Sequence, residues 1–157
     1  MNFDWSATLN HARFSGRRAS SEELALLKGQ LPTLIDDWCI RLMSTYDLIG
    51  YEVVLDSSSD PSGLGVEFRW MTPEQIISEA TEAQPGIAAS QHGFAPIGLC
   101  LSGSGDPYFI NTFESDNPAV VRIPHDAVHH TELDLAAIEV VSPSLSAFLI
   151  GSHSATQ

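Results

Sequence analysis

Apolar and polar positions alternate most clearly between residues 93 and 111. Ile97, Leu99 and Leu101 are separated by small residues, a run of serine, glycine and aspartate follows, and Tyr108 begins an aromatic and β-branched run. Alternation of this kind is typical of strands, and serine, glycine and aspartate are typical turn residues. The pattern predicts a β-hairpin. Asp106 stands at the end of the turn, where its carboxylate is expected to accept backbone N–H groups and close it.

Two helix-capping motifs each stand before a run in which apolar residues recur with helical spacing. Ser20 and Glu23 form a capping box before a leucine stripe, and Thr72 and Gln75 form another around a proline in the first helical turn. A further helix is expected over residues 32–45, after the pair Leu31-Pro32. Its apolar positions recur at three- and four-residue steps: Leu34, Ile35, Trp38, Cys39 and Leu42.

The remaining segments read mainly as strands. Strands are predicted over residues 50–56, 65–71 and 119–123, with a turn over residues 57–63. Residues 124–134 receive no assignment, a short closing helix follows Ser142-Pro143, and residues 151–157 are expected to form a disordered tail. Because helices and strands segregate instead of alternating, the sequence predicts an α+β fold with an antiparallel, meander-like sheet packed against helices.

Composition indicates one folded unit. The chain has 157 residues, 43% of them hydrophobic and 17% charged, which suits a single globular domain over residues 1–157 with an ordered core at about 20–150. Trp38 and Trp70 are expected in that core, because large aromatic side chains are usually buried.

Charge narrows the class of partner. The net charge is −13, and it is uneven: residues 1–30 hold four basic and three acidic side chains, whereas residues 31–157 hold three basic and seventeen acidic ones. Such a surface repels phosphate backbones, so nucleic acid is not expected as a partner. It would attract a basic protein and speed the encounter.

The cellular setting is inferred from cysteine content and hydropathy. Cys39 and Cys100 are too few for a disulfide framework, and each lies among apolar residues, as free buried thiols do. No leader-like stretch opens the chain and no run approaches the length of a membrane span. We therefore expect a soluble cytoplasmic protein that makes no membrane contact.

Motifs for several enzyme classes are incomplete. The only lysine is Lys28, so the glycine-rich run lacks a phosphate-binding Gly-Lys-Ser/Thr. A nucleophile elbow has the pattern Gly-x-Ser-x-Gly, and neither Ser102 nor Ser104 has glycines at those positions. A dinucleotide fingerprint also fails, because Tyr108 stands where its last glycine belongs. No cofactor is expected.

One histidine cluster keeps an enzymatic alternative open. If residues 125–130 were helical, His125 and His129 would share a face, and Asp126 or Glu132 would supply a carboxylate. This arrangement would suit a metal-dependent hydrolase. No third ligand follows from the spacing, so an exposed or capping histidine cluster is the preferred interpretation and no metal is expected.

The order of motifs resembles the SUKH superfamily. The Leu31-Pro32 pair with Trp38 is similar to the opening signature of that family, and the segment from Pro96, Ile97 and Gly98 to Gly105, Asp106 and Tyr108 is similar to its hairpin. Trp70 lies in a strand that leads into a short helix, which also resembles the family pattern. The run from Tyr46 to Gly50 departs from it, since an aromatic-asparagine-glycine turn is usual there. Members include bacterial toxin-immunity proteins and a fungal cell-wall-assembly regulator.

The resemblance and the charge together imply a non-enzymatic inhibitor. It would bind and neutralise a cognate bacterial toxin, for example a basic nuclease, through an acidic surface. A regulatory scaffold similar to the fungal members is the other non-enzymatic alternative. Surface aromatic residues such as Tyr51 or Phe113 are candidate anchors. The carboxylates expected to meet the partner are Glu52, Asp56, Asp60, Glu67, Glu114 and Asp116.

Overall fold

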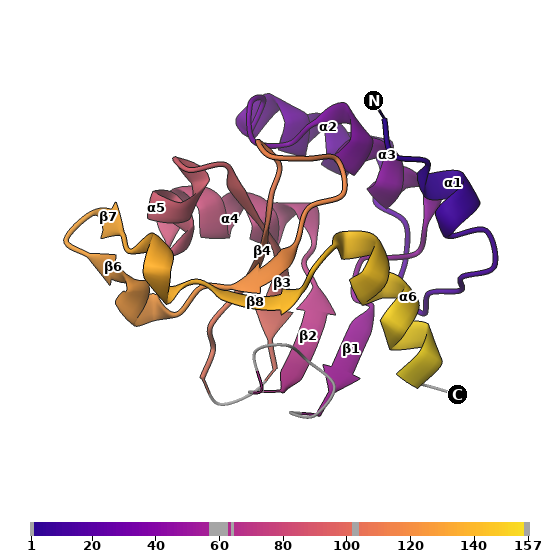
Figure 1. The fold of residues 1–157 in the computed structure, drawn as a ribbon. Helices are drawn as coiled ribbons and strands as arrows, with labels where there is room; N and C mark the ends of the chain where they lie inside the picture. Colours follow the sequence, from indigo (N-terminus) through magenta and orange to yellow (C-terminus); the bar gives the residue numbers. More distant parts are fainter. Residues whose placement is uncertain (1, 57–62, 64, 102–103, 156–157) are drawn as a thin grey trace.

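The fold is α+β, as the sequence predicts. The computed structural model describes residues 2–56, 63, 65–101 and 104–155, in which a six-stranded antiparallel sheet has the order β1-β2-β3-β4-β5-β8 (Figure 1). The strands of this sheet are β1 (Glu52–Leu55), β2 (Val66–Trp70), β3 (Phe94–Cys100), β4 (Tyr108–Asn111), β5 (Val120–Arg122) and β8 (Glu139–Ser142).

The predicted hairpin is formed by β3 and β4. Phe94 lies opposite Asn111 and Ala95 opposite Ile110, and the register shifts between Pro96 and Gly98. Gly105 has φ +66°, a conformation that glycine adopts without a steric penalty. The predicted residues Ser102 and Gly103 lie outside the described residues, as do those of the 57–63 turn except Gly63.

Six α-helices surround the sheet in the described part of the chain. The two predicted capping boxes are confirmed: Ser20 and Thr72 each accept from the backbone N–H three residues on, and Glu23 and Gln75 return the contact. In Figure 1, α6 crosses in front of the sheet and α2 and α3 lie along its upper edge. The helices are α1 (Trp5–Thr8), α2 (Ser21–Gln30), α3 (Asp37–Thr45), α4 (Pro73–Glu82), α5 (Gly86–Ser90) and α6 (Leu145–Ala155).

The predicted start of the second helix is wrong. Helix α3 begins at Asp37, because residues 31–35 close a single turn, with Ile35 N donating to Leu31 O, and Asp36 is then extended at φ −77° and ψ 163°. Leu34 and Ile35 are buried in that turn. The apolar spacing therefore continues across the break, which is why periodicity did not reveal it.

Two apolar clusters hold the central strands. Successive side chains of a strand point to opposite faces. Tyr108 and Ile110 of β4 accordingly join the main core with Trp38 and Trp70, whereas Phe109 joins a smaller cluster with residues of α5 and β5. Strand β4 is thus buried on both faces. Residues 2–19, which lie before the core expected from the sequence, contribute Leu9 to the main cluster.

Residues 124–134, which received no assignment from the sequence, form local structure. They hold a 3₁₀ turn, η1 (His125–Ala127), and a small hairpin of β6 (Val128–His129) and β7 (Glu132–Leu133), and a second 3₁₀ turn, η2 (Leu135–Ala137), follows. Strand β8, which follows, was not predicted.

The closing helix is longer than predicted. Helix α6 continues to Ala155, so the tail expected over residues 151–157 is wrong as far as that residue, and residues 156–157 lie outside the described part. None of the helices in the described ranges combines the length and apolar character needed to cross a bilayer.

Candidate functional site: an acidic groove at one end of the sheet

The topology gathers side chains from distant segments at one end of the sheet. In an antiparallel sheet, the ends of β1, β3 and β5 and the beginnings of β2, β4 and β8 lie together. A groove of about 620 Å³ lies there. We call it the acidic groove; its polar lining is Asp56, Glu67, Ser104, Asp106, Arg122 and Glu139.

Arg122 is the only basic residue among the described residues that line the groove, and its charge is already compensated. Its side chain is 7% exposed, and its Nε donates to Glu139 Oε2 at 2.8 Å. Its Nη1 donates to Gly65 O at 2.8 Å and to the Tyr108 hydroxyl at 3.3 Å. Burial alone would lower the pKa of Arg122, but the hydrogen bonds to Glu139 and Tyr108 outweigh it, so the pKa is raised and the group stays charged.

Tyr108 links the groove to the core. Its ring packs edge-on against Phe68, with centroids 5.4 Å apart, and the Arg122 guanidinium lies 5.7 Å from the ring centroid. Its hydroxyl also accepts from the backbone N–H of Glu67 at 3.3 Å. Burial raises the pKa of Tyr108, so the phenol remains neutral. Hydrogen bonds and core packing therefore hold the side chains of Arg122 and Tyr108 in fixed positions at the groove.

Asp106 makes a contact that the sequence did not predict. Its Oδ1 accepts from His125 N at 3.0 Å and lies 2.6 Å from His125 Nδ1. The carboxylate thus ties the β3–β4 loop to η1, and its predicted role in closing the turn stays a prediction, because Ser102 and Gly103 of that turn lie outside the described residues. The sequence could not indicate this, because the two residues are nineteen positions apart and η1 lies in the segment without a prediction.

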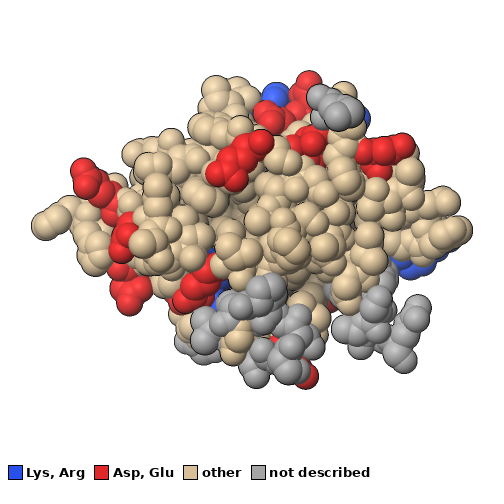
Figure 2. All heavy atoms as spheres, in the orientation of Figure 1, with Lys and Arg blue, Asp and Glu red and all other residues tan. Residues whose placement is uncertain are grey.

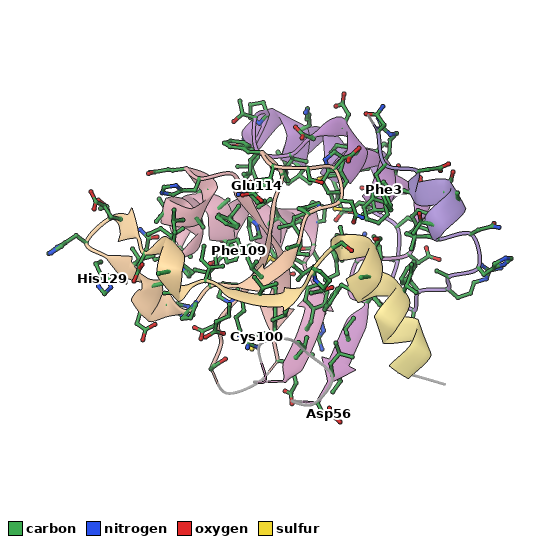
Figure 3. All side chains as sticks on the ribbon, in the orientation of Figure 1. Phe3, Asp56, Cys100, Phe109, Glu114 and His129 are labelled. Carbon is green, nitrogen blue, oxygen red and sulfur yellow. The ribbon has the colours of Figure 1, made fainter. Side chains whose placement is uncertain are left out.

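The predicted partner-binding carboxylates divide between two regions. Asp56 and Glu67 line the groove, whereas Glu52 lies at the start of β1, away from the groove, and is paired with Arg69 at 2.6 Å. Asp60 lies outside the described residues. Glu114 lies on the β4–β5 loop at the opposite end of the molecule from Asp56 (Figure 3). The second region also holds Asp116, whose Oδ2 accepts from Phe3 N at 2.5 Å.

The two candidate aromatic anchors also differ. Phe113 is 59% exposed, as an anchor would be, whereas Tyr51 is 5% exposed and belongs to the main core, so the prediction that it lies on the surface is wrong. Tyr51 directly precedes β1 and packs edge-on against Phe14 at 5.0 Å. That contact with the N-terminal segment covers it.

The residues that carry the family resemblance are structural in this fold. Trp38 and Trp70 are buried, as predicted, together with Leu31 and Ile97. Pro32 lies in the turn before α3, and Pro96 faces Phe109 across the hairpin. At Gly98 a Cβ would overlap the ring of Phe68, so only glycine fits there.

The histidine cluster does not form the helical face that the metal-site alternative required. His125 belongs to a 3₁₀ turn and His129 to β6, so the i, i+4 relation is lost. Among the described residues no group of three or more histidine, cysteine, aspartate or glutamate side chains is placed to hold a metal ion. Cys39 is a free, buried thiol whose pKa is raised by burial, and Cys100 is half-buried with its Sγ 3.4 Å from Ser104 Oγ.

Three groove residues were missed by sequence reasoning. Arg122 interrupts the apolar run from Val120 to Ile123, and a lone charge inside a predicted strand could have been noticed as a buried ion-pair candidate. Glu139 and Ser104 carry no such signal.

Comparison with family models, curated proteins and solved structures found no match for this chain. The resemblance to the SUKH superfamily therefore stays a prediction from motifs.

Figure 2 agrees with the composition. Carboxylates are distributed over the visible face, and lysine and arginine reach it at only a few points.

Proposed function

We propose that this protein is a non-enzymatic binder that captures a basic partner protein in the acidic groove. The observation that carries the proposal is the charge balance of that groove. Four lining carboxylates, Asp56, Glu67, Asp106 and Glu139, face one cation, and Arg122 is already engaged by Glu139. Because carboxylates outnumber lysine and arginine in this lining, an arginine or lysine side chain of a partner would meet net negative charge there.

The partner class follows from the same charge. A net charge of −13 steers cationic surfaces toward the protein and accelerates association. The motif resemblance favours a toxin-immunity role, in which the partner is a cognate toxin and the groove blocks its cationic substrate channel. A scaffold role has no structural observation in its favour.

The test uses charge-neutral substitutions of matched size. The full chain and the double variant Asp56→Asn/Glu67→Gln are tested for binding to the toxin encoded beside the gene and for rescue of cells that express it. The variant should bind the toxin at least about tenfold more weakly, because removing the charge of a carboxylate that contacts a cation lowers the affinity by more than tenfold.

The matched control is Glu22→Gln/Glu74→Gln, which removes two exposed helix carboxylates away from the groove. It should bind the toxin and rescue cells as the unmodified chain does. An equal loss of toxin binding in both variants would show that binding depends on the total charge and not on the groove. Full rescue of cells by the groove variant would contradict the proposal.

A second candidate function rests on the Asp106–His125 pair. A carboxylate 2.6 Å from Nδ1 orients an imidazole so that the other nitrogen can act as a general base toward water. The His125 side chain is 54% exposed and within reach of a substrate. Hydrolysis of a small ester or phosphoester by the pure protein, lost in His125→Ala and retained in His129→Ala, would establish this function in place of the first.

A further inference from the structure

A second pocket lies at the other end of the molecule, between the N-terminal segment and α3. It has a volume of about 270 Å³, and its walls include Phe3, Trp5, Trp38 and Tyr46, with Asp4 and Arg41 among its polar residues. In Figure 3, Phe3 lies beside α1 and α3, far from Asp56 and the acidic groove. We call this site the aromatic pocket.

The aromatic wall is held in place by contacts from three segments. The indole rings of Trp5 and Trp38 stack at 5.9 Å with an interplanar angle of 9°, and Phe3 packs edge-on against Trp5 at 4.8 Å. Asp116 accepts from Phe3 N, and its backbone carbonyl accepts from Trp5 Nε1 at 3.1 Å. The N-terminal segment is therefore fixed over α3 by the β4–β5 loop. Asp116, which the sequence analysis expects to meet a partner, makes both of these contacts with the N-terminal segment.

Arg41 differs from most basic residues of the chain. Within the described residues five of the seven form an ion pair with a carboxylate, whereas Arg13 and Arg41 do not, and of these two only Arg41 lines this pocket. Its side chain is exposed at the pocket. In a protein with twenty carboxylates, a guanidinium without an acidic partner beside an aromatic wall is available for an anion.

Asp4 also lines the pocket but forms no ion pair with Arg41 within the described residues. Its Oδ1 accepts from Ala7 N and from Ser6 Oγ, both at 3.0 Å, so the carboxylate caps α1. These hydrogen bonds, the one from Ala7 first, lower the pKa of Asp4. The Trp38 indole N–H is buried and has no hydrogen-bond partner among the described residues.

We infer that the aromatic pocket binds a small aromatic carboxylate. The flat body of such a ligand would pack against the aromatic side chains, and its carboxylate would meet the Arg41 guanidinium. The volume lies just below the range of about 300–1,000 Å³ that holds drug-sized ligands, so it suits a single ring with a short acidic arm. The net negative charge repels anions at long range, so the short-range contacts must supply the affinity. This inference does not depend on the function of the acidic groove.

The test compares three ligands of one shape and different charge. Phenylacetate, neutral phenylacetamide and cationic phenethylamine are titrated into the full chain, with tryptophan fluorescence and amide chemical shifts as readouts. Phenylacetate should bind most tightly and shift amides around Trp5, Trp38 and Arg41. Equal binding of all three ligands, preference for the cation, or no saturable binding of phenylacetate would overturn the inference.

Two variants and a control separate the contacts. Arg41→Gln should weaken phenylacetate binding about tenfold or more and leave phenylacetamide unchanged, since a hydrogen bond to a charged group is lost. Trp5→Leu should weaken both. Arg13→Gln is the matched control, because Arg13 is exposed and forms no ion pair among the described residues, and binding should not change. A far-ultraviolet circular dichroism spectrum and a melting temperature like those of the unmodified chain would show that the variants are folded. Unchanged phenylacetate affinity in folded Arg41→Gln would also overturn the inference.

Discussion

Arg122 is the residue whose removal should cost the most stability. It is almost fully buried and satisfies Glu139, Gly65 and Tyr108 at once. Breaking a buried pair by removing one partner typically costs about 3–5 kcal/mol, because the other charge is left without compensation. Glu139 is 30% exposed and can recover some hydration, so we expect Arg122→Gln to lower the free energy of unfolding by about 3 kcal/mol in chemical denaturation.

The control for this prediction is Arg69→Gln. Arg69 pairs with Glu52 at 2.6 Å, but both side chains are about half exposed, and exposed pairs contribute about 0–1 kcal/mol. A loss as large as that of Arg122→Gln would show that burial is not what makes the Arg122 pair important.

Gly98 should not tolerate even one methyl group. A Cβ at this position would overlap the Phe68 ring, which is itself packed against Tyr108 and Phe148. Overpacking of a closed core costs about 1–3 kcal/mol, so Gly98→Ala should lower the melting temperature. The matched change Gly29→Ala meets nothing within 4 Å and lies in α2, where alanine is favoured by about 0.5–1 kcal/mol. It should raise the melting temperature.

At the scale of single helices and strands, sequence motifs predict an element correctly where the contact that stabilises it joins residues close in the sequence. The capping boxes of α2 and α4 join residues three positions apart, and the structure confirms both. The start of α3 depends instead on a turn that buries Leu34 and Ile35 against the core. Strand β8 is paired with β5 across the segment that carries η1, β6, β7 and η2, so nothing near it in the sequence marks its partner.

The α2 capping box should give the protein a specific dependence on pH. Hydrogen bonds from Arg17 and then from the Ser20 backbone lower the pKa of Glu23 from 4.5 to about 2. A carboxyl whose pKa is depressed in the folded state adds stability above its unfolded pKa and loses it as the pH falls toward the folded one. The contribution should therefore be complete at neutral pH and decline below about pH 4.5.

This dependence can be measured with Glu23→Gln, which keeps a side-chain acceptor for the Ser20 backbone N–H. Because the pair is largely exposed, the variant should lose less than about 1 kcal/mol at neutral pH. The difference from the unmodified chain should shrink as the pH is lowered from 5 toward 3 in chemical denaturation. A difference that stays constant over this interval would contradict the assignment.

For the whole molecule, the dominant electrostatic property is self-repulsion. The chain holds twenty carboxylates and seven lysine or arginine side chains, so negative charge is in large excess. Added salt screens such repulsion. Sodium chloride should therefore raise the melting temperature while it weakens capture of a basic partner. A melting temperature that falls with salt would show that the ion pairs outweigh the repulsion.

The sequence by itself determined the fold class, the two capped helices, the central hairpin and the burial of both predicted core tryptophans. These features depend on contacts between residues that are close in the sequence, or on hydrophobicity alone, and the amino-acid sequence shows both directly. Only the tertiary structure decided which carboxylates share a groove and that Asp106 bonds His125. It also decided that Tyr51 is buried and that Arg41 lies beside stacked tryptophans without an ion pair to any described residue. The reason is physical: these relations join residues far apart in the chain, and only the pairing order of the strands and the packing of the N-terminal segment bring them into contact.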